Sequence, residues 1–440
     1  MNREPFLKKK GVQTLIASLL CIIVGLLIGF IALLIINPAG APGAIKAIIL
    51  GFVNFQPADR LENAARVLVS TVPLLMCSLA ILYAYKVGLF NIGAAGQFVA
   101  GAGACIYCAV GLGWSWPWCL LAAAVAGALL GMISGLLKSW RNVNEVISGI
   151  MLNWISLYTV NMLLTNVKEP GSNNTHLIGK IAVNQDLIIS AKNMFNAMGL
   201  TDVATSVSGL HTTAYVANGR ALLPSIGLEK LFGDYKYVTI AIPLAVIFAL
   251  IVWFRFSKTK LGYELRATGL NKNAAKYAGM RDNFNLVYTM TMSGALAGIG
   301  AALFYQSGMP HWQTTQSSVP SMGFNGIAAA FLGGLNPIGV IFSSYFIQHI
   351  TEGGTHVDTK FFSKETADFI TSVIIYLSSF VLFIRQTMNR VITNRNEKNQ
   401  KRLAAAKQGA EASAENAPEP LDKETKDADA EKDESKKGGD

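Results

Sequence analysis

Amide and aromatic side chains stand inside, or at the ends of, long apolar stretches of this sequence. Amides donate and accept hydrogen bonds, and aromatic faces stack on flat rings. Such a set suits a pathway for a small, uncharged, polar solute. The alternative is hydrogen bonding between packed membrane helices, worth about 0.6–2 kcal/mol per contact, and Asn161 is a further amide of this kind. The residues predicted to line a pathway are Phe90, Asn91, Gln97, Asn153, Phe324 and Asn325.

Two of these residues begin short segments that resemble each other. The sequence at 90–95 is FNIGAA, and the sequence at 324–329 is FNGIAA. In the topology inferred below, the first segment opens a span that runs outward and the second opens one that runs inward. Inverted repeats of this kind build transport sites from broken helices. A chance match between Gly- and Ala-rich segments is the alternative.

Motifs for ATP hydrolysis, metal binding and hydrolytic catalysis are missing from the sequence. A phosphate-binding loop needs G-x-x-x-x-G-K-[ST], but the nearest segment, 171–181, has seven residues between its glycines and Ile181 after its lysine. No H-E-x-x-H or G-x-S-x-G occurs, and Cys105-x-x-Cys108 lies in an Ala- and Gly-rich stretch where packing is the ordinary role. We therefore predict no catalytic residue, no metal site and no cofactor on this chain.

Ionisable residues are rare in the middle of the apolar stretches. Carriers driven by protons or sodium use such residues at mid-membrane. Glu145 instead lies near the start of a stretch, close to Arg141, where it is expected at the membrane interface. An ion-coupled secondary carrier is therefore kept only as an alternative.

The composition is that of an integral membrane protein. Hydrophobic residues make up 52% of the 440 residues, charged residues make up 15%, and the mean hydropathy is +0.38. A soluble domain carries about 25% charged residues, so an ordinary cytosolic enzyme is excluded, as are a disordered chain and a collagen-like chain. The expected fold is an all-α integral membrane protein.

About ten transmembrane helices are expected, since about 20 apolar residues are needed to span a bilayer. The stretch 323–350 is too long for one helix and contains the breaker Gly-Gly-Leu-Asn-Pro at 333–337, so it is counted as a broken or re-entrant pair. The transmembrane domain covers 12–386 and follows a cytoplasmic segment at 1–11. The other spans are predicted at 12–36, 64–85, 89–111, 117–137, 144–166, 237–254, 284–305 and 366–386.

The distribution of Lys and Arg places both termini on the cytoplasmic side. In this topology twenty of them fall in cytoplasmic segments and four in the short external loops, as the positive-inside rule expects. The segment 411–440 has a net charge of −6 and the whole chain has +10, so residues 1–410 carry +16. We attribute this excess to membrane orientation, since no basic face with interleaved aromatic residues indicates nucleic-acid binding.

Three segments lie outside the predicted spans. Residues 167–236 form a polar external loop. Residues 255–283 form a basic cytoplasmic loop, in which 271–277 is expected to be a short helix that starts at Asn271. Residues 387–440 form a charged cytoplasmic tail, which beyond about 403 is too poor in apolar residues to fold and is expected to be disordered.

Three further segments resemble the permease subunits of ABC importers for simple sugars, nucleosides and branched-chain amino acids. They are 89–97 (LFNIGAAGQ), 144–154 (NEVISGIMLNW) and 266–275 (RATGLNKNAA), and the likeness covers about 60–390. Within this family the chain looks most similar to the nucleoside permeases. The loop at 167–236 is longer than expected for the group, and the acidic tail is not part of the likeness.

The resemblance implies a membrane-spanning subunit of an ATP-driven importer in a bacterial plasma membrane. ATP and Mg would bind a separate cytoplasmic ABC ATPase, a second permease subunit would complete a heterodimer in the membrane lipid, and an extracellular solute-binding lipoprotein would deliver a nucleoside. The segment 262–280 would dock on the ATPase, although its lysines alone also fit a positive-inside loop. The residues expected to couple the two proteins are Gly262, Arg266, Gly269, Asn271, Ala274, Ala275 and Gly279.

Other functions are kept beside a nucleoside importer. A permease for simple sugars, of the ribose or galactose type, differs only in its ligand. An ion-coupled carrier would not need a partner ATPase. A membrane-embedded enzyme would need a catalytic constellation, which the sequence lacks.

Overall fold

The computed structural model of the chain describes residues 10–182 except 170 and 179, residues 215–362 except 359, and scattered positions from 369 to 405. The chain divides into two units, Met1–Gln386 and Thr387–Asp440. In the second unit the described residues, 387–391, 393, 394 and 405, are helical. The rest of the predicted tail lies outside the described residues, as do residues 1–9, residues 183–214 of the predicted external loop and parts of the 366–386 span.

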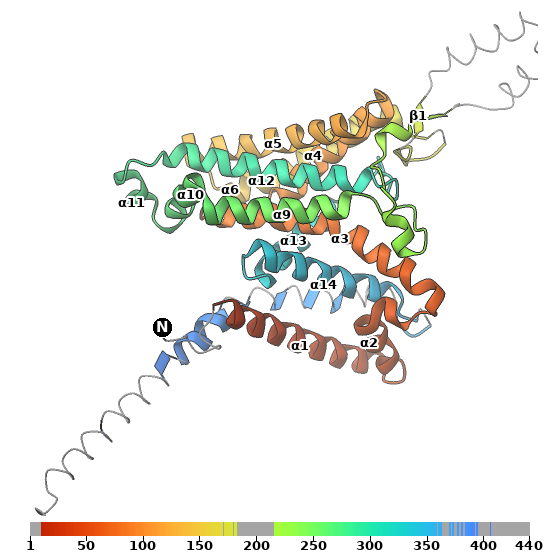
Figure 1. Cartoon of the computed structure of the whole chain (residues 1–440), viewed down its shortest axis with the longest axis horizontal. Helices are drawn as coiled ribbons and strands as arrows, with labels where there is room; N and C mark the ends of the chain where they lie inside the picture. The colour runs from red at the N-terminus through yellow and green to blue at the C-terminus, as the bar shows by residue number, and fades with distance from the viewer. Residues whose placement is uncertain are drawn as a thin grey trace, which may run out of the picture. The chain divides into compact units, whose positions relative to one another are not determined.

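Helices form almost all of the first unit, which confirms the all-α fold class (Figure 1). Seven helices of the described part are long and apolar enough to cross a membrane. The number of ten spans and the orientation of the termini stay predictions. The seven are α1 (Lys10–Ile36), α3 (Pro57–Tyr85), α4 (Ala94–Ile106, continued by the π-helical turn Tyr107–Gly111), α5 (Trp116–Arg141), α6 (Glu145–Leu164), α9 (Ala241–Lys258) and α12 (Asp282–Tyr305).

The remaining elements are shorter. Two three-residue strands, β1 (Lys180–Ala182) and β2 (Tyr215–Ala217), pair antiparallel with Ile181 opposite Val216, and they are the only strands in the described part of the chain. The shorter α-helices are α2 (Ala41–Leu50), α10 (Lys260–Leu270), α11 (Lys272–Tyr277), α13 (Met322–Leu332) and α14 (Pro337–Thr355). Short 3₁₀ turns cover Gly51–Asn54, Thr165–Val167, Gly219–Ala221 and Leu228–Phe232.

An exposed apolar stripe along α5 fits a lipid bilayer. Trp118 and Trp140, 62% and 75% exposed, stand at the two ends of this stripe. Their 22-residue separation corresponds to about 33 Å of helix at 1.5 Å per residue, close to the hydrocarbon thickness of about 30 Å. Tryptophan is enriched at both membrane interfaces, so these two side chains mark the boundaries of the lipid-facing surface. The exposed side chains between them are Leu121, Val125, Leu129, Ile133 and Leu137.

The break predicted at 333–337 separates α13 from α14. Gly334 and Leu335 have φ values of 65° and 56°, so the backbone passes through the left-handed region there. The side chain of Asn336 then caps α14 by accepting a hydrogen bond from the amide of Ile338 at 3.1 Å. The stretch 323–350 is therefore two helices joined by a tight turn.

Several helix boundaries differ by up to five residues from the predicted spans: α4 begins at Ala94 rather than 89, and α9 covers Ala241–Lys258 rather than 237–254. Two larger differences concern α3 and α2. α3 begins at Pro57 instead of 64, because Pro57 and Asp59 favour a helix start but polar residues in the first turns give no hydropathy signal. α2 is absent from the predicted elements, since ten residues are too few for a span. It buries Ala41, Ala44 and Ile48, so tertiary packing rather than length stabilises it.

Helix α12 lies between α5, α4 and α3 at the centre of the first unit (Figure 1). Its Gly294 and Gly298 face Gly127 of α5, and a Cβ atom at any of these positions would strike the facing backbone. Small residues allow membrane helices to approach this closely. The close packing holds α12 against α5, and α12 in turn contacts α4, which carries the candidate residue Gln97.

Candidate functional site

The amides of Asn91 and Gln97 meet at the start of α4, and each residue is 1% exposed. Asn91 Nδ2 donates to Gln97 Oε1 at 2.8 Å and to Ser293 Oγ of α12 at 2.7 Å. Ser293 Oγ donates in turn to the carbonyl oxygen of Ala80 in α3 at 2.6 Å. These hydrogen bonds tie the start of α4 to two other helices.

Asn153 of α6 caps α4 from outside that helix. The first N–H groups of a helix have no partner within it, and Gly93, at the N-cap position, has no side chain to supply one. Asn153 Oδ1 accepts from the amide of Gly96 at 2.7 Å, and its Nδ2 donates to the carbonyl oxygen of Ile92 at 3.1 Å. A Cβ atom at Gly96 would lie 2.7 Å from the Cα of Asn153, so glycine is needed at that position.

Asn91, Gln97 and Asn153 are therefore brought together around the first turn of α4, and their polar atoms bond to protein groups. Hydrogen bonding between packed membrane helices was the alternative to a pathway role, and these bonds are of that kind. A role in lining a pathway stays a prediction for these three residues.

The two similar segments, 90–95 and 324–329, come together in space. A Cβ atom at Gly323 would strike Ala95, so the start of α13 packs directly on the start of α4. α4 runs parallel to α12, as the Asn91–Ser293 bond and the packing of Gly101 on Gly298 require.

The direction of α13 follows from its packing on α3. Gly326 lies against Cys77, and the rings of Phe331 and Tyr85 are 5.1 Å apart, so α13 runs parallel to α3. Because α3 is antiparallel to α12, through the contact of Met76 with Gly300, α4 and α13 run in opposite directions. Two helices thus meet at their N-terminal ends, which is the geometry of an inverted pair.

The other three candidates are more open to the surroundings. Phe324 is 41% exposed at the start of α13, and Phe90 and Asn325 are partly exposed. Within the described part of the chain, the side chain of Asn325 makes no hydrogen bond. A partly exposed amide next to an exposed ring has free donors and acceptors for a ligand.

A buried tryptophan anchors the segment that leads into α13. Trp312 is 1% exposed, and its Nε1 donates to Asn161 Oδ1 of α6 at 2.8 Å. Asn161 Nδ2 donates to the carbonyl oxygen of Gln316 at 2.9 Å, and the amide of Trp312 donates to Thr175 Oγ1 at 3.0 Å. This role of Trp312 cannot be predicted from its neighbours in the sequence, because its partners lie more than 130 residues away along the chain.

Helix α10 packs beneath the turn that leads to Phe90. A Cβ atom at Gly269 would lie 2.5 Å from the carbonyl oxygen of Lys86 and 2.9 Å from the Cα of Val87. At the other end of α10, Gly262 packs on Phe256 of α9 and its amide donates to Thr259 Oγ1 at 3.0 Å. Two of the predicted coupling residues are therefore points of close backbone contact.

A buried hydrogen bond and an ion pair join the same segment to α12. Asn285 Nδ2 donates to Thr268 Oγ1 at 2.9 Å, and Lys272 Nζ lies 3.6 Å from Asp282 Oδ2. Asn285 and Thr268 were not among the predicted site residues. A rigid connection of this kind would move α10 and the start of α12 together.

The predicted short helix after Asn271 is α11. Asn271 Oδ1 accepts from the amide of Ala274 at 3.0 Å and so caps this helix. Ala275 is 4% exposed, Ala274 is exposed, and Gly279 ends the segment with a φ of 77°. Leu270 and Tyr277, 89% and 94% exposed, are large apolar side chains on a helix pair that extends away from the bundle (Figure 1). A docking role for this helix pair stays a prediction.

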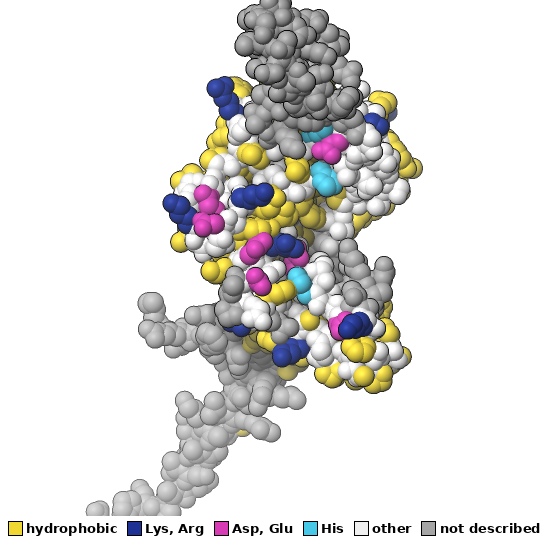
Figure 2. Space-filling model, turned by 90° about the vertical axis from the view of Figure 1, so that its right-hand side faces the viewer, with side chains coloured by type: hydrophobic (Ala, Val, Ile, Leu, Met, Phe, Trp, Pro, Cys, Tyr) yellow, Lys and Arg dark blue, Asp and Glu magenta, His cyan; other side chains and the backbone are white. Residues whose placement is uncertain are grey.

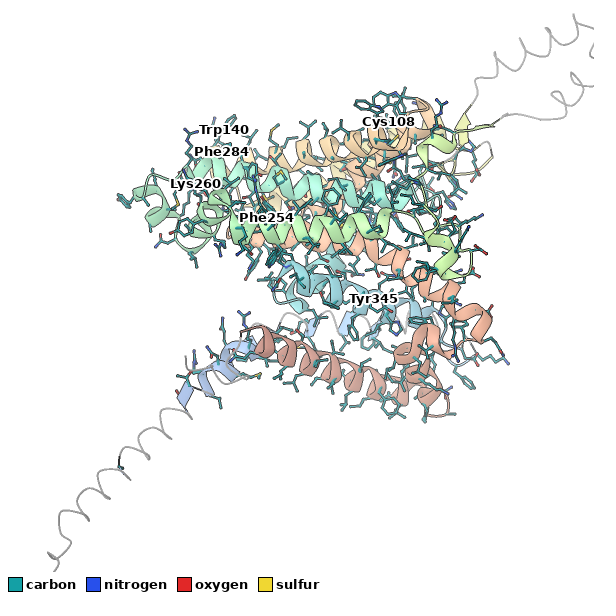
Figure 3. All side chains as sticks on the ribbon, in the orientation of Figure 1. Cys108, Trp140, Phe254, Lys260, Phe284 and Tyr345 are labelled. Atoms are coloured by element: carbon teal, nitrogen blue, oxygen red, sulfur yellow. The ribbon has the colours of Figure 1, made fainter. Side chains whose placement is uncertain are left out.

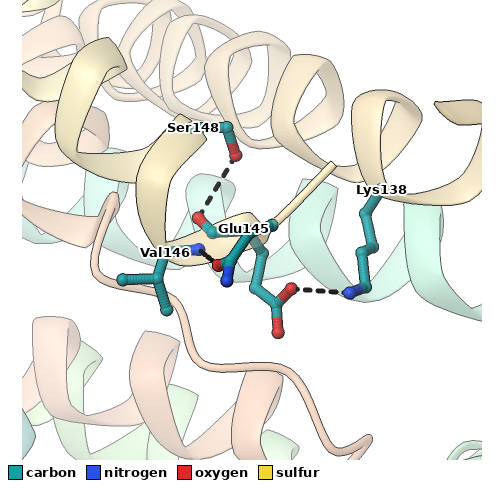
Figure 4. Close-up of polar contacts among 5 residues, drawn as sticks. Lys138, Glu145, Val146 and Ser148 are labelled. Carbon is teal, nitrogen blue, oxygen red and sulfur yellow. Dashed lines mark hydrogen bonds and ion pairs between the residues drawn. The ribbon is translucent and has the colours of Figure 1, made fainter. Parts of the chain in front are cut away.

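The carboxylate of Glu145 forms an ion pair with Lys138, although Arg141 is the basic residue closer to it in the sequence. Lys138 Nζ lies 2.9 Å from Glu145 Oε2 (Figure 4). Asn142 has a φ of 51°, so the chain turns sharply after α5 and the start of α6 faces its last turn. Asn144 caps α6 by accepting from the amide of Val146 at 2.9 Å. The segment 144–154 is thus held at its first turn.

Charges of both signs are present at the end of the helices that carries β1. At the end that carries β1, Lys, Arg, Asp and Glu side chains are scattered among hydrophobic ones on the visible face (Figure 2). Mixed signs do not concentrate an ion of one charge, which suits a neutral solute. Lys260, Phe284 and Trp140 lie at the opposite end, and Cys108 lies at the β1 end (Figure 3).

The known proteins that are similar to this chain include several permeases of ABC transporters. The family model described as branched-chain amino acid transport system / permease component matches residues 63–379. The guanosine ABC transporter permease protein NupP of Bacillus subtilis is 29% identical over 391 residues, which cover 87% of this chain and 98% of the relative. The nucleoside ABC transporter permease protein NupB of Lactococcus lactis is 29% identical over 72% of this chain and 78% of its own.

A sugar permease is also similar. The glucose ABC transporter permease protein TsgB13 of Haloferax volcanii is 27% identical over 78% of this chain and 80% of its own. No solved structure matches the chain.

Proposed function

This chain belongs to the branched-chain amino acid transport system / permease component family, and from that premise we propose that it carries nucleosides inward across the membrane. Membership of this family shows the general class of the protein. The protein is a permease component of an ABC transporter, a transport subunit and not an enzyme, and a multi-pass protein of the bacterial cell membrane.

Nucleosides are the proposed substrate because two of the similar permeases are named for guanosine and for nucleosides. The geometry around α13 supports this choice. The exposed ring of Phe324 can stack on a base, and the open amide of Asn325 can bond to its edge. Phe90 supplies a second partly exposed ring in the segment that packs beside them. The similarity to a glucose permease makes simple sugars the second candidate.

Energy for transport would come from a separate ABC ATPase that binds ATP and Mg. The surface proposed to dock on it is α10–α11, including Arg266 and Ala274. The observation that carries this proposal is the contact of Gly269 with Lys86 and Val87. Because Phe90 follows that turn within four residues, a displacement of α10 would move the start of the proposed pathway.

Two further partners complete the proposed transporter. A second permease subunit would form a heterodimer with this chain and cover the exposed side of α6. Three large side chains lie on that side: Trp154, Tyr158 and Met162, which are 42%, 59% and 74% exposed. An extracellular solute-binding lipoprotein would meet the end that carries β1. Tight binding would belong to that receptor, since a pathway must also release its solute.

Uptake of radiolabelled guanosine and ribose by cells with and without this chain tests the proposal. Loss of guanosine uptake alone is the expected result. Loss of ribose uptake alone would move the protein to the sugar permeases with the same fold and mechanism. Unchanged uptake of both compounds would overturn the nucleoside assignment.

A further inference from the structure

A cavity of about 690 Å³ lies between α1, the α9–α10 corner and the α13–α14 turn. Its size is within the range of about 300–1,000 Å³ typical of small-molecule sites. The hydroxyl of Ser18 in α1 donates to the carbonyl oxygen of Leu332 at 2.6 Å, which closes one wall of the cavity. None of the residues predicted to line the solute pathway lines this cavity.

Three positively charged side chains converge on the cavity. Lys86, Arg266 and Arg385 line it, and no Asp or Glu is among its lining residues in the described part of the chain. Burial lowers the pKa of Lys86, and the positive charges of Arg266 and Arg385 lower it further. The pocket therefore has a positive potential that an anion would relieve.

Hydrogen-bond donors are available for that anion. Arg266 uses Nε for the carbonyl oxygen of Gly262 at 3.3 Å in its own helix, and its terminal guanidinium nitrogens carry four more N–H donors. The ammonium group of Lys86 has three N–H donors. Phosphate oxygens accept several such bonds at once.

The rest of the cavity wall is apolar. Ile22 of α1, Trp253 of α9 and Phe342 of α14 contribute to it, and Phe342 is 71% exposed. α1 itself is mostly unburied along its apolar length. A ligand that fits both parts has an anionic head and an apolar chain, and basic pockets between membrane helices on the cytoplasmic side bind such headgroups. A neutral nucleoside matches neither part.

We propose that this cavity binds the phosphate headgroup of an anionic phospholipid, with an acyl chain along α1 and α14. The bound phosphate connects Lys86, which precedes the Phe90 segment, with Arg266 of α10. It therefore acts as a positioning ligand between α10 and the bundle. Free inorganic phosphate has the same head chemistry without the apolar chain.

The test measures lipid binding by the purified full-length chain in phosphatidylcholine nanodiscs. Part of the phosphatidylcholine is replaced with phosphatidylglycerol that carries brominated acyl chains, which quench nearby tryptophans. We expect phosphatidylglycerol to quench Trp253 more strongly than brominated phosphatidylcholine does. The Trp253→Phe variant isolates this signal from that of the other six tryptophans.

Lys86→Met is expected to weaken the phosphatidylglycerol-specific quenching about fivefold in apparent affinity, as for one basic residue at an anionic surface. Lys86→Arg should retain it. Lys260→Gln is the matched control, since its side chain is 91% exposed on α10 and it does not line the cavity. Native mass spectrometry of the same variants reports retained lipid if one of them is too unstable for nanodiscs.

Three results would overturn the proposal: equal quenching by both lipids, equal loss in Lys86→Met and Lys260→Gln, or full relief of quenching by inorganic phosphate. The third would assign the site to a free anion. The measurement needs neither a substrate nor an ATPase, so its failure is separate from failure of the nucleoside assignment.

Discussion

The Cα of Gly269 in α10 lies against the carbonyl oxygen of Lys86, so closely that a Cβ atom there would be 2.5 Å from that oxygen. Lys86 ends α3, and the chain then turns through Gly88, which has a φ of 79°, to reach Phe90. Helix α10, which is proposed to bind the ATPase, thus contacts the turn that leads to Phe90, which is proposed to contact the solute. A displacement of α10 would therefore be passed through Lys86 to the start of α4, where Asn91 is hydrogen-bonded to Ser293 of α12.

Gly269→Ala is expected to destabilise the protein by about 1–3 kcal/mol, because overpacking forces the 86–87 backbone to move. Solute uptake should fall more than the amount of folded protein does. Thermal unfolding of the purified protein and uptake normalised to membrane content measure the two effects. Gly43→Ala is the control, since a Cβ atom at Gly43 meets no atom within 4 Å. Equal behaviour of the two variants would contradict the contact.

Removal of the amide that caps α4 should also be costly. Asn153→Ala leaves the amide of Gly96 without its partner in a buried site, and loss of a cap costs about 0.5–2 kcal/mol. We expect a lower unfolding temperature for this variant. Asn166→Ala, at an exposed position just after α6, should leave it unchanged. A stable Asn153→Ala protein with normal uptake would show that α4 does not depend on this cap.

Phe324 should affect substrate handling more than stability. Its ring is 41% exposed, and stacking of a base on an aromatic side chain is worth about 1–3 kcal/mol. Phe324→Ala is therefore expected to raise the apparent KM for guanosine uptake about tenfold, with a change of less than about 0.5 kcal/mol in stability. Phe254→Ala is the control, because Phe254 is 55% exposed on α9 and is not among the residues predicted to line the pathway. Similar KM values for both variants would remove Phe324 from the pathway.

Variants of Ala274 and Ala275 distinguish an effect on ATPase docking from an effect on the folding of α11. Ala274 is exposed and Ala275 is 4% exposed, so Ala274→Glu should leave the protein folded in the membrane whereas Ala275→Glu should destabilise α11. We expect Ala274→Glu to abolish uptake and to prevent co-purification of the partner ATPase. Asn166→Glu serves as the control, because Asn166 is also exposed but follows the C-terminal end of α6, outside α10 and α11. Normal uptake with Ala274→Glu would place the docking surface elsewhere.

Local signals in the sequence were enough to predict elements that are determined by neighbouring residues. The start of α11 at Asn271 and the break before Asn336 follow from capping and from the Gly-Gly-Leu-Asn-Pro sequence, and both are confirmed. The Asn153–Gly96 cap joins residues 57 positions apart, and Trp312 meets Asn161 across 151 positions. No local pattern encodes such pairs, because they depend on which helices become neighbours.

Residue type alone also does not distinguish a pathway residue from a packing residue. The amide of Asn91 is unusual in an apolar stretch, and this property suits both a pathway and a buried hydrogen bond. The structure gives it hydrogen bonds to Gln97 and Ser293. The exposed fraction of each side chain, which separates Phe324 from Asn91, is a property of the packed bundle and could not be obtained from residue type.

Lys86 predicts a pH dependence of stability. Burial and the charges of Arg266 and Arg385 hold its pKa in the folded protein below the ordinary value of 10.5. The charged form is therefore disfavoured by folding, so the penalty is complete below the lowered pKa. It is relieved as the pH rises from that value toward 10.5. In phosphatidylcholine without anionic lipid, stability should rise over this alkaline window.

Lys86→Met should be more stable than the unchanged protein at pH 7 and should lack the alkaline rise, because it carries no charge to lose. Unfolding temperatures measured between pH 7 and pH 10 check this, and Lys260→Met is the control for loss of an exposed lysine. A rise that persists in Lys86→Met would assign the pH dependence to another group. Because a bound phosphate would favour the charged form of Lys86, anionic phospholipid should reduce the difference between Lys86→Met and the unchanged protein at pH 7.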